Sequence, residues 1–89
     1  MQTNQTGEPV TLDRLPTDIP AVVIAVDRAA AHSRRLLDLG LTEGTRVCAV
    51  LVAPGGDPRA YLWRGTLIAL RNRDARAVTV RLEAEGDAP

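Results

Sequence analysis

Two side chains in this sequence could bind a transition metal strongly, the single histidine His32 and the single cysteine Cys48. Metal sites on helices usually pair two ligands that lie three or four residues apart. The positions three and four residues after His32 are Arg35 and Leu36, and neither side chain is a metal ligand. Free cysteine commonly packs as a small apolar side chain. The sequence therefore predicts no metal site and no cofactor.

The same scarcity of reactive groups argues against catalysis. One His and one Cys form no recognisable motif of a nucleophile with its base. The stretch APGGDP, residues 53–58, has glycines but lacks the Lys-Ser/Thr of a phosphate-binding loop, and it contains two prolines. This stretch is typical of a turn. We expect a protein that is not an enzyme.

Cysteine content and hydropathy indicate a compartment. Because Cys48 is alone, no disulfide can form within the chain, and a reduced cytoplasmic setting fits best. The longest apolar run, residues 21–26, is far too short for a signal peptide or a membrane span. We expect a soluble protein without direct membrane insertion.

The charge is balanced in total but unevenly distributed. Eleven basic residues, all of them Arg, offset eleven acidic ones. Residues 58–81 carry six Arg against Asp74 alone, whereas both flanking parts of the chain are net acidic. A neutral total argues against bulk nucleic-acid binding. The basic stretch permits an acidic partner or a phosphate contact. The alternative is a solvated exterior of Arg-rich composition, and both interpretations stay open.

An apolar side chain among arginines is the best candidate for partner binding. Leu37 lies about 100° around a helix from Leu36 and is flanked by Arg34 and Arg35. Either Leu37 is a small exposed docking spot with a cationic rim, or it packs on the flank of the domain. We therefore predict a partner-binding set on this helix and the third strand, comprising Arg34, Arg35, Leu37, Arg59 and Arg64.

The aromatic residues raise a similar question. Tyr61 and Trp63 share one face of a predicted strand with Arg59. They form a sticky surface patch if they point outward and ordinary core if they point inward. The chain has no Phe, so we favour at least partial burial of Trp63.

One helix with a defined end is predicted between the first two strands. Residues 28–39 favour helix, and Asp27 is a candidate N-cap. If Gly40 adopts the left-handed conformation, Leu36 and Leu41 become the contacting pair of a Schellman motif. Gly44 and Gly65 are turn positions. The predicted structural set is Leu36 and Leu39 in the core, Leu41 at the helix end, and Gly40, Gly44 and Gly65 in turns.

Apolar patterning predicts five short strands, at residues 21–26, 45–52, 59–64, 66–71 and 78–82. The first strand is apolar on both faces, with Val22, Ile24 and Val26 on the bulkier one, and the second becomes so from Val47 onward. Both are therefore predicted to be covered on both sides. Thr11 is expected to cap one helical turn over residues 11–15, and Asn72 another over 72–76.

The remaining residues complete the predicted organisation. Residues 1–10 and 83–89 resemble disordered tails, the second of them acidic. Residues 11–82 then form one mainly β domain. We expect a small SH3-like barrel of five strands, with one helix between strands one and two and a helical turn before the last strand, because closure removes the sheet edges.

The series of motifs along the chain resembles the FeoA family, the small cytosolic component of bacterial ferrous iron uptake. Residues 11–82 carry it in order, as TLDRLP, RRLLDLGLTEGTRV, APGGDP and RGTLIALRNRDARAVTV. Two positions depart from the family pattern, Thr17 after Pro16 and Thr66 after Gly65.

The resemblance implies an SH3-like fold, no enzymatic activity, and a partner: the large ferrous iron permease FeoB with its cytosolic GTP-binding domain. It also implies a cytoplasmic protein that reaches the inner membrane through that partner. Two alternatives are a nucleic-acid-binding SH3-like domain that uses the Arg-rich face, and an effector-sensing barrel related to the C-terminal domain of iron-dependent repressors. We predict no nucleic-acid partner and allow for weak self-association.

Overall fold

The structure is a computed structural model, and it describes residues 8–83 of the chain. It is mainly β with two short α-helices, which agrees with the predicted fold class. The elements follow one another as β1 (Pro9–Thr11), η1 (Leu12–Arg14), β2 (Ala21–Val26), α1 (Ser33–Asp38), β3 (Arg46–Val52), η2 (Pro54–Gly56), β4 (Arg59–Trp63), β5 (Thr66–Leu70), α2 (Asn72–Ala75) and β6 (Val78–Leu82).

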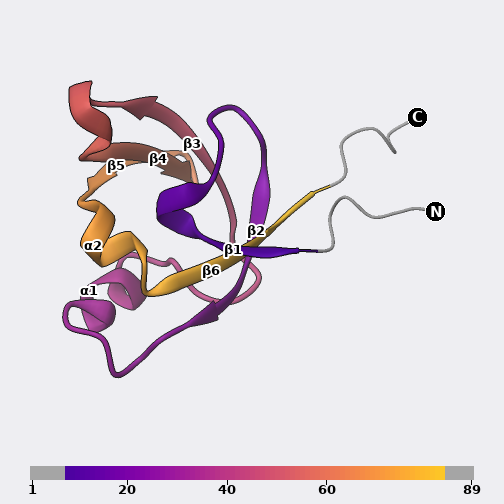
Figure 1. The fold of residues 1–89 in the computed structure, drawn as a ribbon. Coiled ribbons are helices and arrows are strands. Elements are labelled where there is room, and N and C mark those ends of the chain that lie inside the picture. Colours follow the sequence, from indigo (N-terminus) through magenta and orange to yellow (C-terminus); the bar gives the residue numbers. More distant parts are fainter. Residues whose placement is uncertain (1–7, 84–89) are drawn as a thin grey trace.

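The strands form one antiparallel sheet in the order β1-β6-β2-β3-β4-β5. The sheet bends so that β3, β4 and β5 curve away from β1, β6 and β2, and the core lies within the bend (Figure 1). The expected closure is wrong, because β1 and β5 remain as edges over the described residues. A sixth strand also appears where a tail was expected, since Pro9 and Val10 begin β1 and pair with β6.

A β-bulge decides which residues of β2 face the core. The register with β6 shifts between Val23 and Ala25. Ala21 and Val23 point inward before the shift and Val26 points inward after it, so the predicted face of Val22, Ile24 and Val26 is wrong. Strict alternation fails here because a bulge inserts one extra residue and resets the pleat.

The outer face of β3 is uncovered. Val47 and Ala49 are buried, whereas Leu51, which pairs with the outward Ala60 of β4, is 60% exposed. The prediction that this strand is covered on both sides is therefore wrong. A second apolar face does not imply a second covering layer, and this one is left in contact with solvent.

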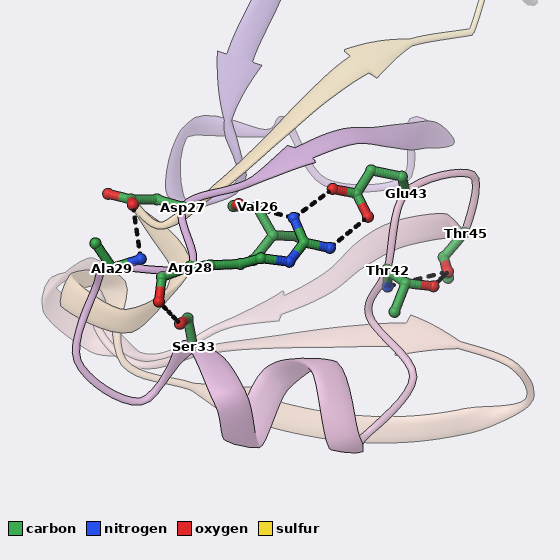
Figure 2. A network of polar contacts seen from close by, with 8 residues as sticks. All are labelled: Val26, Asp27, Arg28, Ala29, Ser33, Thr42, Glu43 and Thr45. Atoms are coloured by element: carbon green, nitrogen blue, oxygen red, sulfur yellow. Dashed lines mark hydrogen bonds and ion pairs between the residues drawn. The ribbon is translucent and has the colours of Figure 1, made fainter.

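Helix α1 begins later than predicted, at Ser33 rather than at residue 28. The preceding loop is a series of turns, and His32 has a φ of 69°, in the left-handed region that a helix cannot continue through. Asp27 does not cap a helix; its Oδ1 accepts a hydrogen bond from the Ala29 amide at 3.0 Å (Figure 2).

A polar network ties this loop to the turn before β3 (Figure 2). The Arg28 guanidinium donates to both carboxylate oxygens of Glu43, at 3.0 and 3.1 Å. The Ser33 hydroxyl donates to the Arg28 carbonyl at 3.2 Å. The Arg28 contact lowers the pKa of Glu43, first through the hydrogen bond and then through charge attraction. Both ends of α1 are thereby held to the same strand–turn junction.

The end of α1 has the hydrogen bonds of a Schellman motif. The Leu41 amide donates to the Leu36 carbonyl at 3.0 Å, and the Gly40 amide donates to the Leu37 carbonyl at 2.9 Å. Gly40 has a φ of 94°, and Leu36 and Leu41 are both buried. The predicted stop is present. Gly44 and Gly65 also have positive φ, of 91° and 77°.

Leu39, expected in the core, is instead 39% exposed. Ser33, Leu36 and the half-buried Leu37 define an inward arc of the helix. At 100° per residue, Leu39 lies roughly 110° from the middle of that arc. The expectation was wrong because a spacing of three from Leu36 points to the side away from Leu37.

The caps of the two short helical turns, η1 and α2, also differ from the predicted ones. Leu12, the first residue of η1, and Leu15, which follows η1, are both fully buried. The Thr11 hydroxyl donates a hydrogen bond to the Asp13 carboxylate and does not cap the turn. Asn72 is the first residue of α2 and Arg71 holds the N-cap position. The Asn72 side chain donates to the Gly56 carbonyl at 2.8 Å, so it fastens α2 to η2.

Candidate partner-binding surface

The inward face of β4 settles the position of one predicted partner residue. Arg59 is 9% exposed and donates from its two terminal nitrogens to the carbonyls of Asp13 and Leu15, at 2.7 and 2.6 Å. Its guanidinium carbon lies 5.8 Å from the centre of the Tyr61 ring. Arg59 therefore holds η1 against the core and is not available to a partner, which corrects the prediction.

The two aromatics on the same face are also interior. The Tyr61 hydroxyl donates to the Leu12 carbonyl at 3.2 Å, and the Trp63 indole nitrogen donates to the Leu39 carbonyl at 3.0 Å. Burial raises the pKa of Tyr61, partly opposed by the nearby Arg59 charge. Trp63 is 2% exposed, so the favoured burial is confirmed and the aromatic surface patch is excluded.

The exposed leucine next to the arginines of α1 is not the one that we expected. Arg34 and Arg35 are exposed, as predicted. Leu37 is half-buried and packs against the core, which is the second of the two interpretations left open. Leu39 is the exposed leucine beside these arginines. The helical-arc geometry described above could have identified it from sequence once the helix start was known.

Arg64 lies beside the end of the same helix although it follows β4 in sequence. It is exposed, has a φ of 54°, and forms the β4–β5 hairpin loop with Gly65. Its side chain runs across Gly40: a Cβ placed on Gly40 would lie 3.0 Å from Arg64 Nε. Four of the five predicted partner residues therefore lie on or beside α1, and three of them, Arg34, Arg35 and Arg64, are exposed.

A groove of about 170 Å³ separates α1 from the edge strand β5. Arg35 and Leu39 line it on the helix side, and Ile68, Ala69 and Arg71 line it on the strand side. Within residues 8–83, none of Arg34, Arg35, Arg64 and Arg71 forms a salt bridge. The groove therefore combines apolar side chains with two arginines and one carboxylate, Asp74, which forms no salt bridge with either arginine within the described residues.

The exposed apolar residues of β3, β4 and β5 escaped the sequence analysis. Leu51, Leu62 and Leu67 are 60%, 42% and 53% exposed. The signal was present, because alternation in β4 places Ala60 and Leu62 opposite Arg59, Tyr61 and Trp63. It was missed because an apolar face was assumed to be a covered one.

Other candidate chemistry has little support in the part of the chain that the structure describes. Over residues 8–83, no three side chains of His, Cys, Asp or Glu come together as a group that could hold a metal ion. None of the described helices is both long enough and apolar enough to cross a bilayer. Surface groups, rather than a pocket with reactive side chains, are what the described fold presents.

A bent antiparallel sheet with short helices defines a small SH3-like domain. The family model for the FeoA domain matches residues 10–82. This chain belongs to the FeoA family, which takes part in ferrous iron transport and is not a known enzyme family.

A transport protein that contains a similar domain illustrates this family membership. A fusion protein of Fe(2+) transport protein A and the Fe(2+) transporter FeoB, from Porphyromonas gingivalis, is 31% identical over 71 residues. Those residues are 80% of this chain but 8% of the fusion protein, so the chain spans a small part of that relative.

Solved structures agree on the fold. The FeoA-like protein of Clostridium acetobutylicum has a TM-score of 0.80 at 27% identity, covering 86% of this chain and 90% of that one. The zinc complex of Stenotrophomonas maltophilia FeoA, described as an SH3 domain protein, has a TM-score of 0.72 at 37% identity, covering 80% and 88%. A manganese-dependent transcriptional repressor, at 13% identity and a TM-score of 0.76, shows the fold alone; the match covers 92% of this chain and 45% of that one.

Proposed function

We propose that this protein is a non-enzymatic accessory component of ferrous iron transport that binds the cytosolic part of a FeoB-type permease. The supporting observation is the fusion relative, in which a domain 31% identical to this one is joined to the transporter in one chain. Joining two domains in one chain raises their effective concentration, which is useful only if they act together.

The surface around α1 is the proposed contact. Arg34, Arg35 and Arg64 are exposed, free of salt bridges within the described residues, and adjacent to the exposed Leu39. Exposed charges at an interface act mainly on the rate of encounter and on specificity, whereas apolar anchors contribute affinity. The protein then acts at the cytoplasmic side of the inner membrane through its partner.

Binding to the full-length permease of the same organism, held in nanodiscs, tests the proposal by surface plasmon resonance. We expect saturable binding that the Arg34→Glu/Arg35→Glu double variant weakens, mainly through a slower association rate. The single variants Arg34→Glu and Arg35→Glu are compared with Arg81→Glu, which makes the same change in net charge as either of them. Arg81 is exposed on β6 and has no salt bridge within residues 8–83. Absence of binding to the permease would overturn the proposal.

The nucleic-acid alternative is tested on the same instrument with duplex DNA and single-stranded RNA. It predicts binding that weakens steeply as salt rises. The accessory function predicts no such binding at about 150 mM salt, where non-specific electrostatic attraction is largely screened.

A further inference from the structure

The outer face of β3, β4 and β5 is apolar across all three strands. Cys48, Leu62 and Leu67 form one cross-strand row, because Cys48 pairs with Leu62 and Leu62 with Leu67. A second row comprises Leu51, Ala60 and Ala69. We call these six residues the outer apolar face. An antiparallel sheet with one solvent-facing side normally alternates apolar-in and polar-out, and β4 and β5 do not.

The outer apolar face is exposed as well as apolar. Leu51, Leu62 and Leu67 keep 60%, 42% and 53% of their surface, and Ala69 is exposed as well. Strand β6 differs, since its outer positions Thr79 and Arg81 are polar. Isolated surface leucines are ordinary, but a contiguous face across three strands is typical of an interaction site.

Arginines border this face on opposite sides. Arg64 lines a shallow hollow together with Cys48 and Leu62. Arg35 and Arg71 line the groove that holds Ala69 and Leu39 on the β5 side. Within the described residues none of these three arginines has a carboxylate partner in a salt bridge. Leu39 thereby continues the apolar surface from the sheet to α1.

The positive charge of the bordering arginines indicates which kind of partner surface fits the outer apolar face. A second copy packed face to face across a twofold axis would bring arginine borders together, and like charges in register are unfavourable. A partner with apolar side chains ringed by Asp and Glu meets both features at once. Such a partner surface gains burial at its centre and charge complementarity at its rim.

We propose that the outer apolar face, with its border of Arg35, Arg64 and Arg71, is the docking site for an apolar, acid-rimmed surface on the cytosolic part of the permease. This inference rests on the proposed function and names the surface and the partner chemistry that serve it. The central strand β4 supplies the anchor position, Leu62, which lies between Cys48 on β3 and Leu67 on β5.

The test uses the full chain and the full-length permease in nanodiscs. Leu62→Glu and Leu67→Glu should each weaken binding by about 30-fold or more, the loss typical of a central apolar anchor. Leu62→Gln should weaken it less, because it adds no charge of the partner's sign. Arg81→Ala is the control with the same change in net charge as Leu62→Glu, and it should change the dissociation constant less than about twofold. Urea unfolding of each variant confirms that it is folded.

The outcomes separate this inference from the proposed function. If the unaltered protein does not bind the permease, the proposed function fails. If it binds and the folded Leu62→Glu variant binds equally well, the docking surface is wrong while the function stands. If sedimentation shows a dimer of the unaltered chain that Leu62→Glu converts to a monomer, the occupant is a second copy and the inference is overturned. A monomer that loses permease binding in both Glu variants supports it.

Discussion

The two faces of β4 carry opposite chemistry on one five-residue strand. Its inward residues, Arg59, Tyr61 and Trp63, all have polar ends, yet they are the buried ones. Its outward residues, Ala60 and Leu62, are apolar, yet Leu62 is 42% exposed. Arg59, which is charged and buried, and Leu62, which is apolar and exposed, both depart from the usual rule of apolar inside and polar outside.

Backbone carbonyls explain the inward face. The inward side chains donate to carbonyls in or directly after η1 and at the end of α1. Helix ends leave carbonyls without helical partners, although the Leu12 carbonyl also accepts from the Leu15 amide at 3.1 Å. Small helical segments supply few internal hydrogen bonds, so β4 supplies the donors instead. The outward face needs no such role in folding. The comparison suggests that one face of the strand stabilises the domain while the other is free to bind.

The largest expected difference in the free energy of unfolding is between substitutions of Trp63 and Leu62, adjacent residues on opposite faces of β4. Trp63→Ala should lower the free energy of unfolding by about 3–5 kcal/mol, because it removes a large buried ring and leaves a cavity. Leu62→Ala should lower it by less than about 1 kcal/mol, because that side chain remains partly in water. Urea denaturation of the two variants measures the difference. Similar losses in both would show that the outer face is part of the core.

Arg59 tests the inward face through its hydrogen bonds. Arg59→Met keeps much of the side-chain volume but strands the carbonyls of Asp13 and Leu15, so we expect a loss of about 2–4 kcal/mol in the free energy of unfolding. Arg81→Met, at an exposed site, should change it by less than about 0.5 kcal/mol. Equal stabilities of the two variants would mean that Arg59 does not hold η1.

Substitution of Tyr61 should have the smallest effect on the free energy of unfolding, and it should change how that free energy depends on pH. Tyr61→Phe removes the hydrogen bond to the Leu12 carbonyl and should cost about 1 kcal/mol near neutral pH. Burial raises the pKa of Tyr61 in the folded state, so the folded protein holds the phenol proton more tightly than the unfolded chain. Its contribution is complete below the unfolded pKa of about 10 and is lost as pH rises through the folded pKa.

The pH profile of unfolding checks this sign. Urea denaturation of the unaltered protein from pH 8 to 11 should show stability falling above pH ~10. The Tyr61→Phe variant should fall less steeply over the same range, because it has no phenol to ionise. Parallel profiles for the two proteins would contradict a raised pKa at Tyr61.

Sequence patterning predicted the element order and the helix stop well, and it did so through local rules. The interpretation of Gly40 as a left-handed stop with Leu36 and Leu41 in contact depends on residues five apart, which belong to one local motif. The positions of the five predicted strands followed from short apolar runs bounded by turn residues. The SH3-like class followed from the number and order of the predicted elements, and the resemblance of the whole series of motifs implied the same fold.

The wrong predictions concern side-chain burial and strand register, which depend on contacts between residues far apart in the sequence. Nothing local distinguishes Arg59 from an exposed arginine, because its partners Asp13 and Leu15 lie more than forty residues away. The bulge in β2 depends on the register with β6, which is adjacent in the sheet but is the last strand in the sequence. The outer apolar face was missed for the related reason that sequence shows which residues are apolar, but not which faces remain uncovered.

Methyl NMR of this chain during titration with the full-length permease in nanodiscs tests most directly whether the two faces of the sheet divide folding from binding. We predict that the Leu51, Leu62 and Leu67 methyl signals shift or broaden with saturation, while the buried Val78 and Val80 methyls stay unperturbed. Saturable changes confined to β6, β2 or β1, with the three leucine signals unmoved, would contradict the account.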